Sequence, residues 1–114
     1  DVELDEEIDQ ELFGASLTST GAAFLVNVKM YKKLCMIARR QNARCKKFKR
    51  AKNKKMFVIC KRRLAKTKHK MAKGRRRLVA QWRKLDGKWK KGWSKKNKIS
   101  FAGFLKKYGP HQFQ

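Results

Sequence analysis

Residues that interrupt helices are scarce in this 114-residue sequence. Its one proline is Pro110, and between positions 22 and 85 its one glycine is Gly74. Proline removes a backbone donor, and glycine costs about 1 kcal/mol in a helix interior, so their scarcity allows long helices. No apolar run approaches the roughly 20 residues that a membrane-spanning helix requires. The sequence therefore predicts long helices that do not cross a membrane.

Acidic residues are almost confined to the beginning of the chain. Seven of the eight lie within residues 1–11, and Asp86 is the eighth. Residues 29–114 contain all 33 Lys and Arg residues and one acid, which gives this part a net charge of +32. Such a body repels itself unless salt or an anionic partner screens it. The composition predicts a polyanionic partner: nucleic acid, an anionic membrane or an acidic glycoprotein.

Residues that perform catalysis or hold cofactors are also few. The carboxylates cluster near the N-terminus rather than forming an acid–base pair, and no glycine-rich phosphate loop is present. The cysteines form no CxxC pair, and His69 and His111 are isolated. A nucleophilic pair of Cys45 or Cys60 with His69 lacks an orienting acid. We predict a non-enzymatic protein with no metal, no cofactor and no small-molecule substrate.

Two interpretations of the cysteines stay open. Cys35, Cys45 and Cys60 are an odd set, which is not a complete disulfide framework but is compatible with one disulfide and one thiol. Three buried thiols that act as small core residues are the preferred interpretation, because free cysteine is commonly buried. The sequence does not indicate the oligomeric state of the protein.

Apolar residues recur at helical spacing in two long segments. Intervals of three, four and seven residues put them on one face of each segment, with Lys and Arg between them. The stretch "KRAKNKK" between the segments predicts a turn around Asn53, which makes an antiparallel hairpin that buries both faces. Gly74 lies on the buried face, where it either permits close helix approach or breaks the second helix. The predicted core residues are Phe24, Val28, Tyr31, Phe57, Cys60, Leu64, Met71, Leu78 and Trp82.

The last third of the chain has a different pattern. The pair "DG" predicts a turn, and the glycine-containing stretch "KWKKGWSKKNK" predicts irregular structure. Ser100 has the position of an N-cap for a short final helix, with Gly109 at its C-terminal cap. We therefore predict an all-α fold, a compact bundle of about five helices around the long hairpin. Residues 1–21 are an acidic N-terminal arm, and residues 22–114 are the basic helical domain.

Basic pairs and triplets are the strongest functional pattern. Lys outnumbers Arg by 23 to 10, which favours diffuse contact with a polyanion over the planar recognition that Arg provides. The alternative is a solvated face that only keeps the protein soluble, but the charge exceeds what solubility requires. The acidic arm is either a solvated tail or a segment that lies on the basic body until a partner displaces it. The predicted residues that bind an anionic surface are Arg39, Arg40, Lys46, Lys47, Arg62, Arg63, Arg75, Arg76, Arg77, Lys90 and Lys91.

Aromatic residues gather toward the C-terminus. Trp89 and Trp93 lie among lysines near glycines, a pattern found at membrane interfaces and in stacking platforms for bases. Together with Phe101 and Phe104, they are the predicted membrane or apolar contact residues. The alternative is that the tryptophans close the open end of the hairpin core.

Three groups of residues, taken in order, form a pattern that is found in a known family. They are Ala23-Phe24, Val26 and Lys29; Lys54-Lys55, six mostly apolar residues, Arg62-Arg63 and Thr67; and Phe101, Phe104-Leu105-Lys106 and Pro110. In residue type, order and spacing they resemble the sperm lysin family of abalone and related marine snails. Compared with lysin, the chain is shorter between its second helix and its C-terminal group, is richer in Lys, and has cysteines and the acidic arm. It is therefore more similar to the diverged acrosomal branch associated with membrane fusion than to lysin itself.

The resemblance implies an all-α bundle of about five helices that is secreted from the sperm acrosomal vesicle and acts without catalysis. Its partners are then anionic lipids of the egg membrane, and its function is to promote sperm–egg membrane fusion. The alternative within the family is binding of the egg-envelope glycoprotein and dissolution of the vitelline envelope. The alternative from another class is an RNA-binding structural protein, such as an organellar ribosomal subunit, and only this alternative has nucleic acid as the partner.

Overall fold

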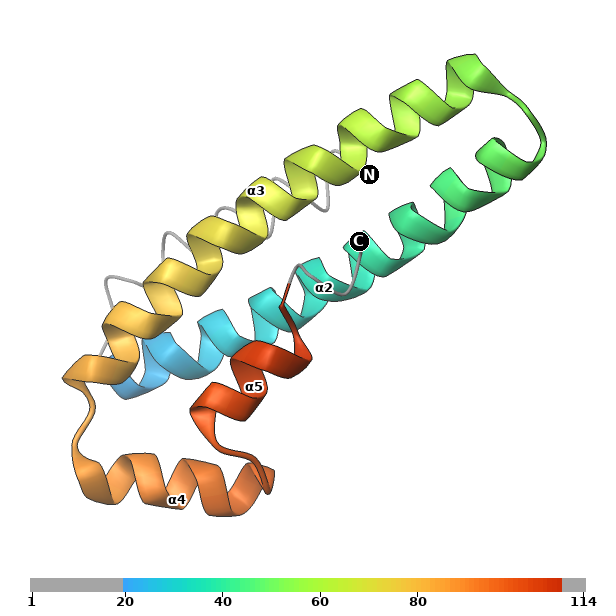
Figure 1. Cartoon of the computed structure of the whole chain (residues 1–114). Coiled ribbons are helices and arrows are strands. Elements are labelled where there is room, and N and C mark those ends of the chain that lie inside the picture. The colour runs from blue at the N-terminus through green and yellow to red at the C-terminus, as the bar shows by residue number, and fades with distance from the viewer. Residues whose placement is uncertain (1–19, 110–114) are drawn as a thin grey trace.

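The computed structural model describes residues 20–109, and it contains four α-helices in this range (Figure 1). α2 (Thr20–Arg50) and α3 (Lys54–Lys84) have 31 residues each and pack side by side in opposite directions. α4 (Gly87–Asn97) crosses the end of this pair, and α5 (Phe101–Lys107) returns beside α2. The predicted all-α class and long hairpin are confirmed.

Two details of the prediction differ from the structure. Residues 20–109 form four helices rather than about five. The arrangement is elongated rather than compact, since its extents are 53 × 27 × 18 Å, and the two long helices determine its length. Pro110 and the acidic arm, apart from its last two residues, lie outside the described residues.

The turn between α2 and α3 consists of residues 51–53. Lys52 has a left-handed φ of 56°, the N–H of Asn53 donates to the carbonyl of Phe48, and the N–H of Lys52 donates to that of Lys49. This pair of bonds is the Schellman arrangement, which satisfies the last carbonyls of a helix. Asn53 Oδ1 then accepts the N–H of Met56 at 3.2 Å and caps α3. The predicted turn around Asn53 is confirmed.

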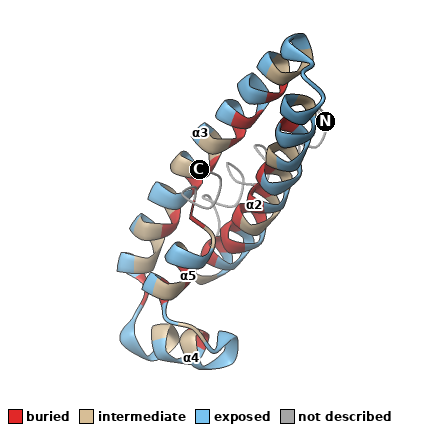
Figure 2. Cartoon of the chain, turned by 45° about the vertical axis from the view of Figure 1, so that its right-hand side comes forward, coloured by how far each residue is buried: buried red, intermediate tan, exposed pale blue. Residues whose placement is uncertain are grey.

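The core lies along the facing sides of α2 and α3, where the buried residues form a continuous line (Figure 2). Seven of the nine predicted core residues are buried, but Phe57 and Trp82 are half-buried. Phe57 lies near the turn, which only two helices form, and Trp82 has one face near the Lys90 ammonium group, 5.6 Å from its ring centroid. These two rings are therefore partly buried and pack against the edge of the core.

Gly74 lies where the two long helices approach closely. α3 continues through this residue, which is buried, and a Cβ added to it would lie 3.4 Å from Tyr31 Cδ1. Of the two interpretations of Gly74, the structure supports the close approach of the helices. The alternative, that Gly74 breaks the second helix, is wrong.

The stretch after Asp86 is helical, so the prediction of irregular structure there is wrong. Asp86 Oδ1 accepts the N–H of Trp89 at 2.7 Å and caps α4, and the buried Trp93 anchors the helix to the core. Ser100 Oγ accepts the N–H of Gly103 at 3.0 Å, which confirms the predicted N-cap of α5. Gly109 follows the final cap residue, but its φ is not in the left-handed region, so it does not provide the predicted glycine cap.

Candidate polyanion-binding surface

The predicted basic residues lie on the outer sides of the helices. Nine of the eleven are exposed, and Arg77 and Lys90 are half-buried. Because the apolar residues of α2 and α3 face one another, the Lys and Arg residues between them in sequence point away from the core (Figure 2). These residues are spread along α2, α3 and α4 rather than gathered in one cluster. The result is a diffuse cationic surface, the kind that binds a polyanion without a fixed register.

The hairpin tip, residues 46–55, is the densest part of this surface. Seven of its ten residues are Lys or Arg, and all seven are exposed. The side chain of Phe48 is half-buried, as is that of the neighbouring Phe57. Positive charge is therefore most concentrated where the core is thinnest.

The aromatic end of the molecule is built around Phe24, which is fully buried. Four rings surround it at centroid distances of 5.4 to 5.8 Å: those of Trp82, Trp89, Trp93 and Phe101. Trp82 also stacks on Phe101 at 4.5 Å. Together with Phe24, these rings belong to α2, α3, α4 and α5, so the aromatic cluster holds α4 and α5 on the hairpin.

The four predicted membrane or apolar contact residues belong to this end. Trp93, Phe101 and Phe104 are buried, and Trp89 is half-buried with its ring against Phe24. In the folded chain these side chains pack on the core instead of forming a membrane-contact surface, because α4 and α5 turn them toward the hairpin. The alternative, in which the two tryptophans close the open end of the core, is the arrangement found.

The large apolar side chains that are exposed are different ones, and no pattern in the sequence singles them out. They are Leu25, Val26 and Met36 on α2 and Val58 on α3. Leu25 and Met36 are half-exposed and eleven residues apart, which is three helical turns, so they share the outer face of α2. Lys29 and Lys33 lie between them on that face. This part of α2 therefore combines apolar and cationic side chains.

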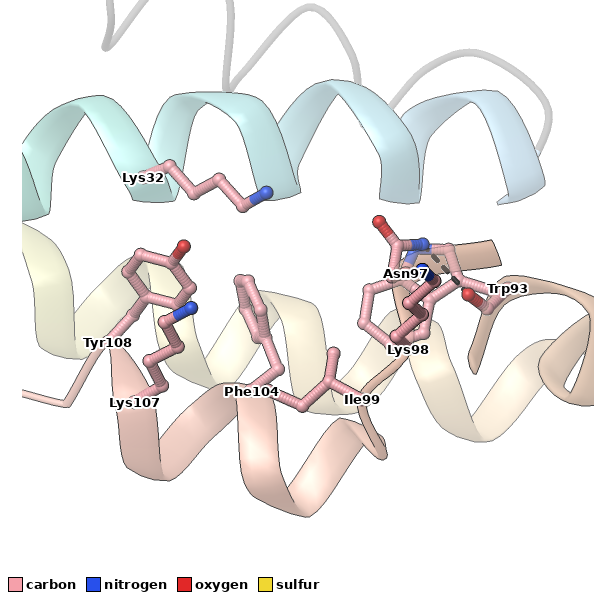
Figure 3. Close-up of a pocket in the computed structure, with 8 residues that line it drawn as sticks. All are labelled: Lys32, Trp93, Asn97, Lys98, Ile99, Phe104, Lys107 and Tyr108. Carbon is pink, nitrogen blue, oxygen red and sulfur yellow. Dashed lines mark hydrogen bonds between the residues drawn. The ribbon is translucent and has the colours of Figure 1, made fainter. Parts of the chain in front are cut away.

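A pocket of about 220 Å³ lies between α2 and the α4–α5 turn. Figure 3 shows that it has aromatic and aliphatic walls from Trp93, Ile99, Phe104 and Tyr108. The side chains of Lys32, Lys98 and Lys107 also line it, together with the amide of Asn97. The sequence analysis did not identify this pocket, since its lysines lie far apart in the chain.

The three cysteines are free and buried, so they act as the three core thiols of the preferred interpretation. Cys60 Sγ donates to the carbonyl of Gln41 at 3.4 Å. Burial and the hydrogen bond with Cys60 raise the pKa of the Cys45 thiol from 9.0 to about 11. Burial also raises the pKa of Cys35. Thiols with raised pKa values are poor nucleophiles at neutral pH.

Residues 20–109 contain no group of three or more His, Cys, Asp or Glu side chains that could hold a metal ion. None of the helices in this range has the length and apolar character needed to cross a bilayer. Comparison with known protein families, curated proteins and solved structures finds no match for the chain.

Proposed function

We propose that the protein is a secreted, non-enzymatic fertilisation protein of the sperm acrosomal vesicle that binds anionic lipids of the egg membrane and promotes sperm–egg membrane fusion. The observation that supports this most directly is the joining of a diffuse cationic surface to an aromatic cluster closed only by two short helices. The resemblance to the sperm lysin family supplies the biological setting. The all-helical hairpin agrees with the fold that this resemblance implies.

Binding to the membrane begins with charge. Each Lys or Arg near an anionic bilayer contributes about 1 kcal/mol, and the exposed residues of α2 and α3 supply many such contacts along the 53 Å length of the protein. The outer face of α2 adds Leu25 and Met36, which lie beside lysines and can enter the headgroup region. This first step needs no change in the fold.

Perturbation of the bilayer requires a second step, because the aromatic rings are buried in the folded chain. α4 buries one residue, Trp93, and α5 buries two, Phe101 and Phe104, so the attachment of these two short helices depends on a small number of aromatic side chains. Segments with few buried side chains open at lower free energy than the whole fold. Separation of α4 and α5 from the hairpin would release aromatic side chains, which favour the membrane interface.

Lipid mixing and leakage assays test both steps. With vesicles that contain phosphatidylserine, we expect mixing and leakage that decrease with salt, and with phosphatidylcholine alone we expect neither. Brominated lipids should quench the tryptophan emission of membrane-bound protein, because opening brings Trp89 and Trp93 into the bilayer. The double variant Leu25→Ser/Met36→Ser is a control, since it weakens adsorption but leaves the aromatic end intact. The absence of mixing on anionic vesicles, or emission that brominated lipids leave unchanged, would refute the membrane mechanism.

The two alternatives make different demands on the same surface. Binding of an egg-envelope glycoprotein requires no opening of α4 and α5, and it predicts selective binding to isolated envelopes with no effect on vesicles. Sequence-tolerant RNA binding uses exposed rings for base stacking, and no aromatic side chain between residues 20 and 109 is exposed. RNA binding by this protein would therefore depend on phosphate contacts and fall steeply with salt. RNA affinity far above vesicle affinity at physiological salt would favour the ribosomal alternative.

A further inference from the structure

Three lysines from three parts of the fold line one pocket. Lys32 belongs to α2, Lys98 ends α4, and Lys107 is the last residue of α5. The ammonium groups of Lys32 and Lys107 lie 5.7 and 5.6 Å from the centroid of the same ring, that of Tyr108. Figure 3 shows Lys32 and Lys107 near the Tyr108 hydroxyl, and Lys98 at the other side of the pocket, toward Asn97 and Trp93. The tertiary structure thus brings together here three lysines that lie far apart in the chain.

No carboxylate of the described residues neutralises these lysines. Asp86 is the one acid between residues 20 and 109, and its Oδ1 is occupied at the opposite end of α4, where it accepts the N–H of Trp89. Three ammonium groups around a small pocket repel each other, and the repulsion is relieved by an anion held between them. The pocket therefore has the charge of an anion site.

Lys98 occupies a backbone conformation that disfavours its side chain. Its φ of 54° is left-handed, a position at helix ends that is usually glycine. The N–H of Ile99 donates to the carbonyl of Ser94 at 3.2 Å, which holds this turn in place. The strained residue is thus held at the wall of the pocket, and Lys52 provides a comparison, because it has a similar φ of 56° at the distant hairpin tip.

The walls limit what kind of anion fits. Trp93, Ile99 and Phe104 offer apolar contact, while the Tyr108 hydroxyl is a further donor. The Asn97 amide is held by its donation to the carbonyl of Trp93 at 2.8 Å. A volume of about 220 Å³ holds a tetrahedral oxyanion together with a small organic body, rather than a bare ion alone. Lysines bind such oxyanions as point charges.

We propose that this pocket binds a sulfate or phosphate monoester carried on a small organic body, with Lys32, Lys98 and Lys107 holding the oxyanion. The site goes beyond the proposed membrane function, because it is a defined pocket rather than a diffuse surface. A sulfated sugar and a phosphate headgroup are the two sources of such an ester. The proposal rests on the pocket alone, so its test uses soluble compounds and no membrane.

The test titrates the full chain at physiological salt with two esters and their neutral parents. The probes are galactose 6-sulfate with galactose, and glycerol 3-phosphate with glycerol, followed by amide NMR and by tryptophan emission. We expect at least one ester to shift the signals of residues 97–108 while its parent does not, and the ester that binds more tightly identifies the source. Lys32→Gln, Lys98→Gln and Lys107→Gln should each weaken binding about tenfold, the effect of losing one charge-assisted hydrogen bond.

Matched variants distinguish ester binding in the pocket from nonspecific attraction to the positive charge of the protein. Lys66→Gln and Lys73→Gln remove one exposed lysine each from α3 and should change the affinity less than about twofold. Lys98→Gly and Lys52→Gly both relieve a left-handed backbone, but only Lys98→Gly should weaken ester binding. Circular dichroism checks that each variant is folded. Equal losses in pocket and control variants, or esters that bind no better than their parents, would overturn the proposal.

Discussion

The aromatic end and the hairpin tip of this protein have opposite compositions. At the aromatic end, Phe24 is fully buried among four rings, and helices α2 to α5 all contribute to its surroundings. At the tip, only α2 and α3 are present, Phe48 and Phe57 are half-buried, and seven of ten residues are basic. The first region holds the fold together, and the second presents charge.

This difference teaches how a chain with a net charge of +25 can fold. Aromatic pairs contribute about 0.5–1.5 kcal/mol each beyond their burial, and they are concentrated at the end that lies far from the tip. Repulsion at the tip acts on exposed side chains that water and salt screen. Stability and charge density are thus separated along the length of one hairpin.

The largest expected effect compares a ring at each end. Phe24→Ala should lower the free energy of unfolding by about 3–5 kcal/mol, because it leaves a cavity among four rings. Phe57→Ala should lower it by only about 1 kcal/mol, since the side chain is only partly buried. Urea denaturation followed by circular dichroism measures both without adding salt. Equal losses at the two positions would mean that the tip contributes to stability as much as the aromatic end.

A smaller change in the free energy of unfolding is expected for substitutions of Gly74, which lies between the two ends. Gly74→Leu should destabilise the fold by about 1–3 kcal/mol, because the added atoms meet the Tyr31 ring. Gly74→Ala is the matched control: its Cβ would lie 3.4 Å from Tyr31 Cδ1, an ordinary contact, and alanine favours a helix by about 1 kcal/mol. A destabilised alanine variant would show that the helices approach more closely than this distance.

At alkaline pH, the free energy of unfolding should depend on one buried titratable group in each half of the molecule. Burial raises the pKa of Tyr31, which packs on Phe104, from 10.0 to about 12, and the pKa of Cys45, nearer the tip, from 9.0 to about 11. Above pH 9 the unfolded chain loses the Cys45 proton that the folded chain keeps. The stability that this thiol contributes is therefore complete below pH 9 and falls at up to about 1.4 kcal/mol per pH unit until pH 11.

Urea denaturation at a series of pH values measures this loss. Cys45→Ala should flatten the decline between pH 9 and 11, and Tyr31→Phe should flatten it between pH 10 and 12. If both variants follow the wild-type slope, neither group is responsible. The neutral thiol and phenol themselves should leave stability near pH 7 independent of pH.

The smallest effect is a gain of stability at the tip. Lys52→Gly should stabilise the fold by about 1 kcal/mol, because glycine adopts the left-handed φ of 56° without a steric cost. Lys66→Gly, in the exposed interior of α3, is the matched control and should destabilise by about 1 kcal/mol. Thermal unfolding compares the two. A loss at Lys52 would mean that its turn does not depend on this conformation.

Much of the scaffold could be predicted from the local sequence. The periodic apolar residues from Phe24 to Leu78, the turn at Asn53 and the cap at Ser100 all depend on near neighbours in the chain. α4 was missed because its two glycines predict irregular structure, whereas the Asp86 cap and the buried Trp93 overcome that preference. Local propensity is a weak guide where tertiary contacts oppose it.

The functional residues were harder to predict. A tryptophan among lysines has the same sequence pattern whether its ring faces water or a core, so the sequence left open whether Trp93 contacts a membrane or closes the core. Its direction depends on the packing of α4 against Phe24, at a centroid distance of 5.7 Å. The pocket was missed for a similar reason, since Lys32, Lys98 and Lys107 meet only after α5 returns beside α2.

The two long helices, their apolar sides and the sign of the charge follow from the sequence alone, because these properties arise from composition and from spacings within a few turns. Which aromatic rings are buried and which lysines share a pocket depends instead on the tertiary structure. Both outcomes depend on where two short helices fold back, and that position is selected by contacts between residues distant in the chain.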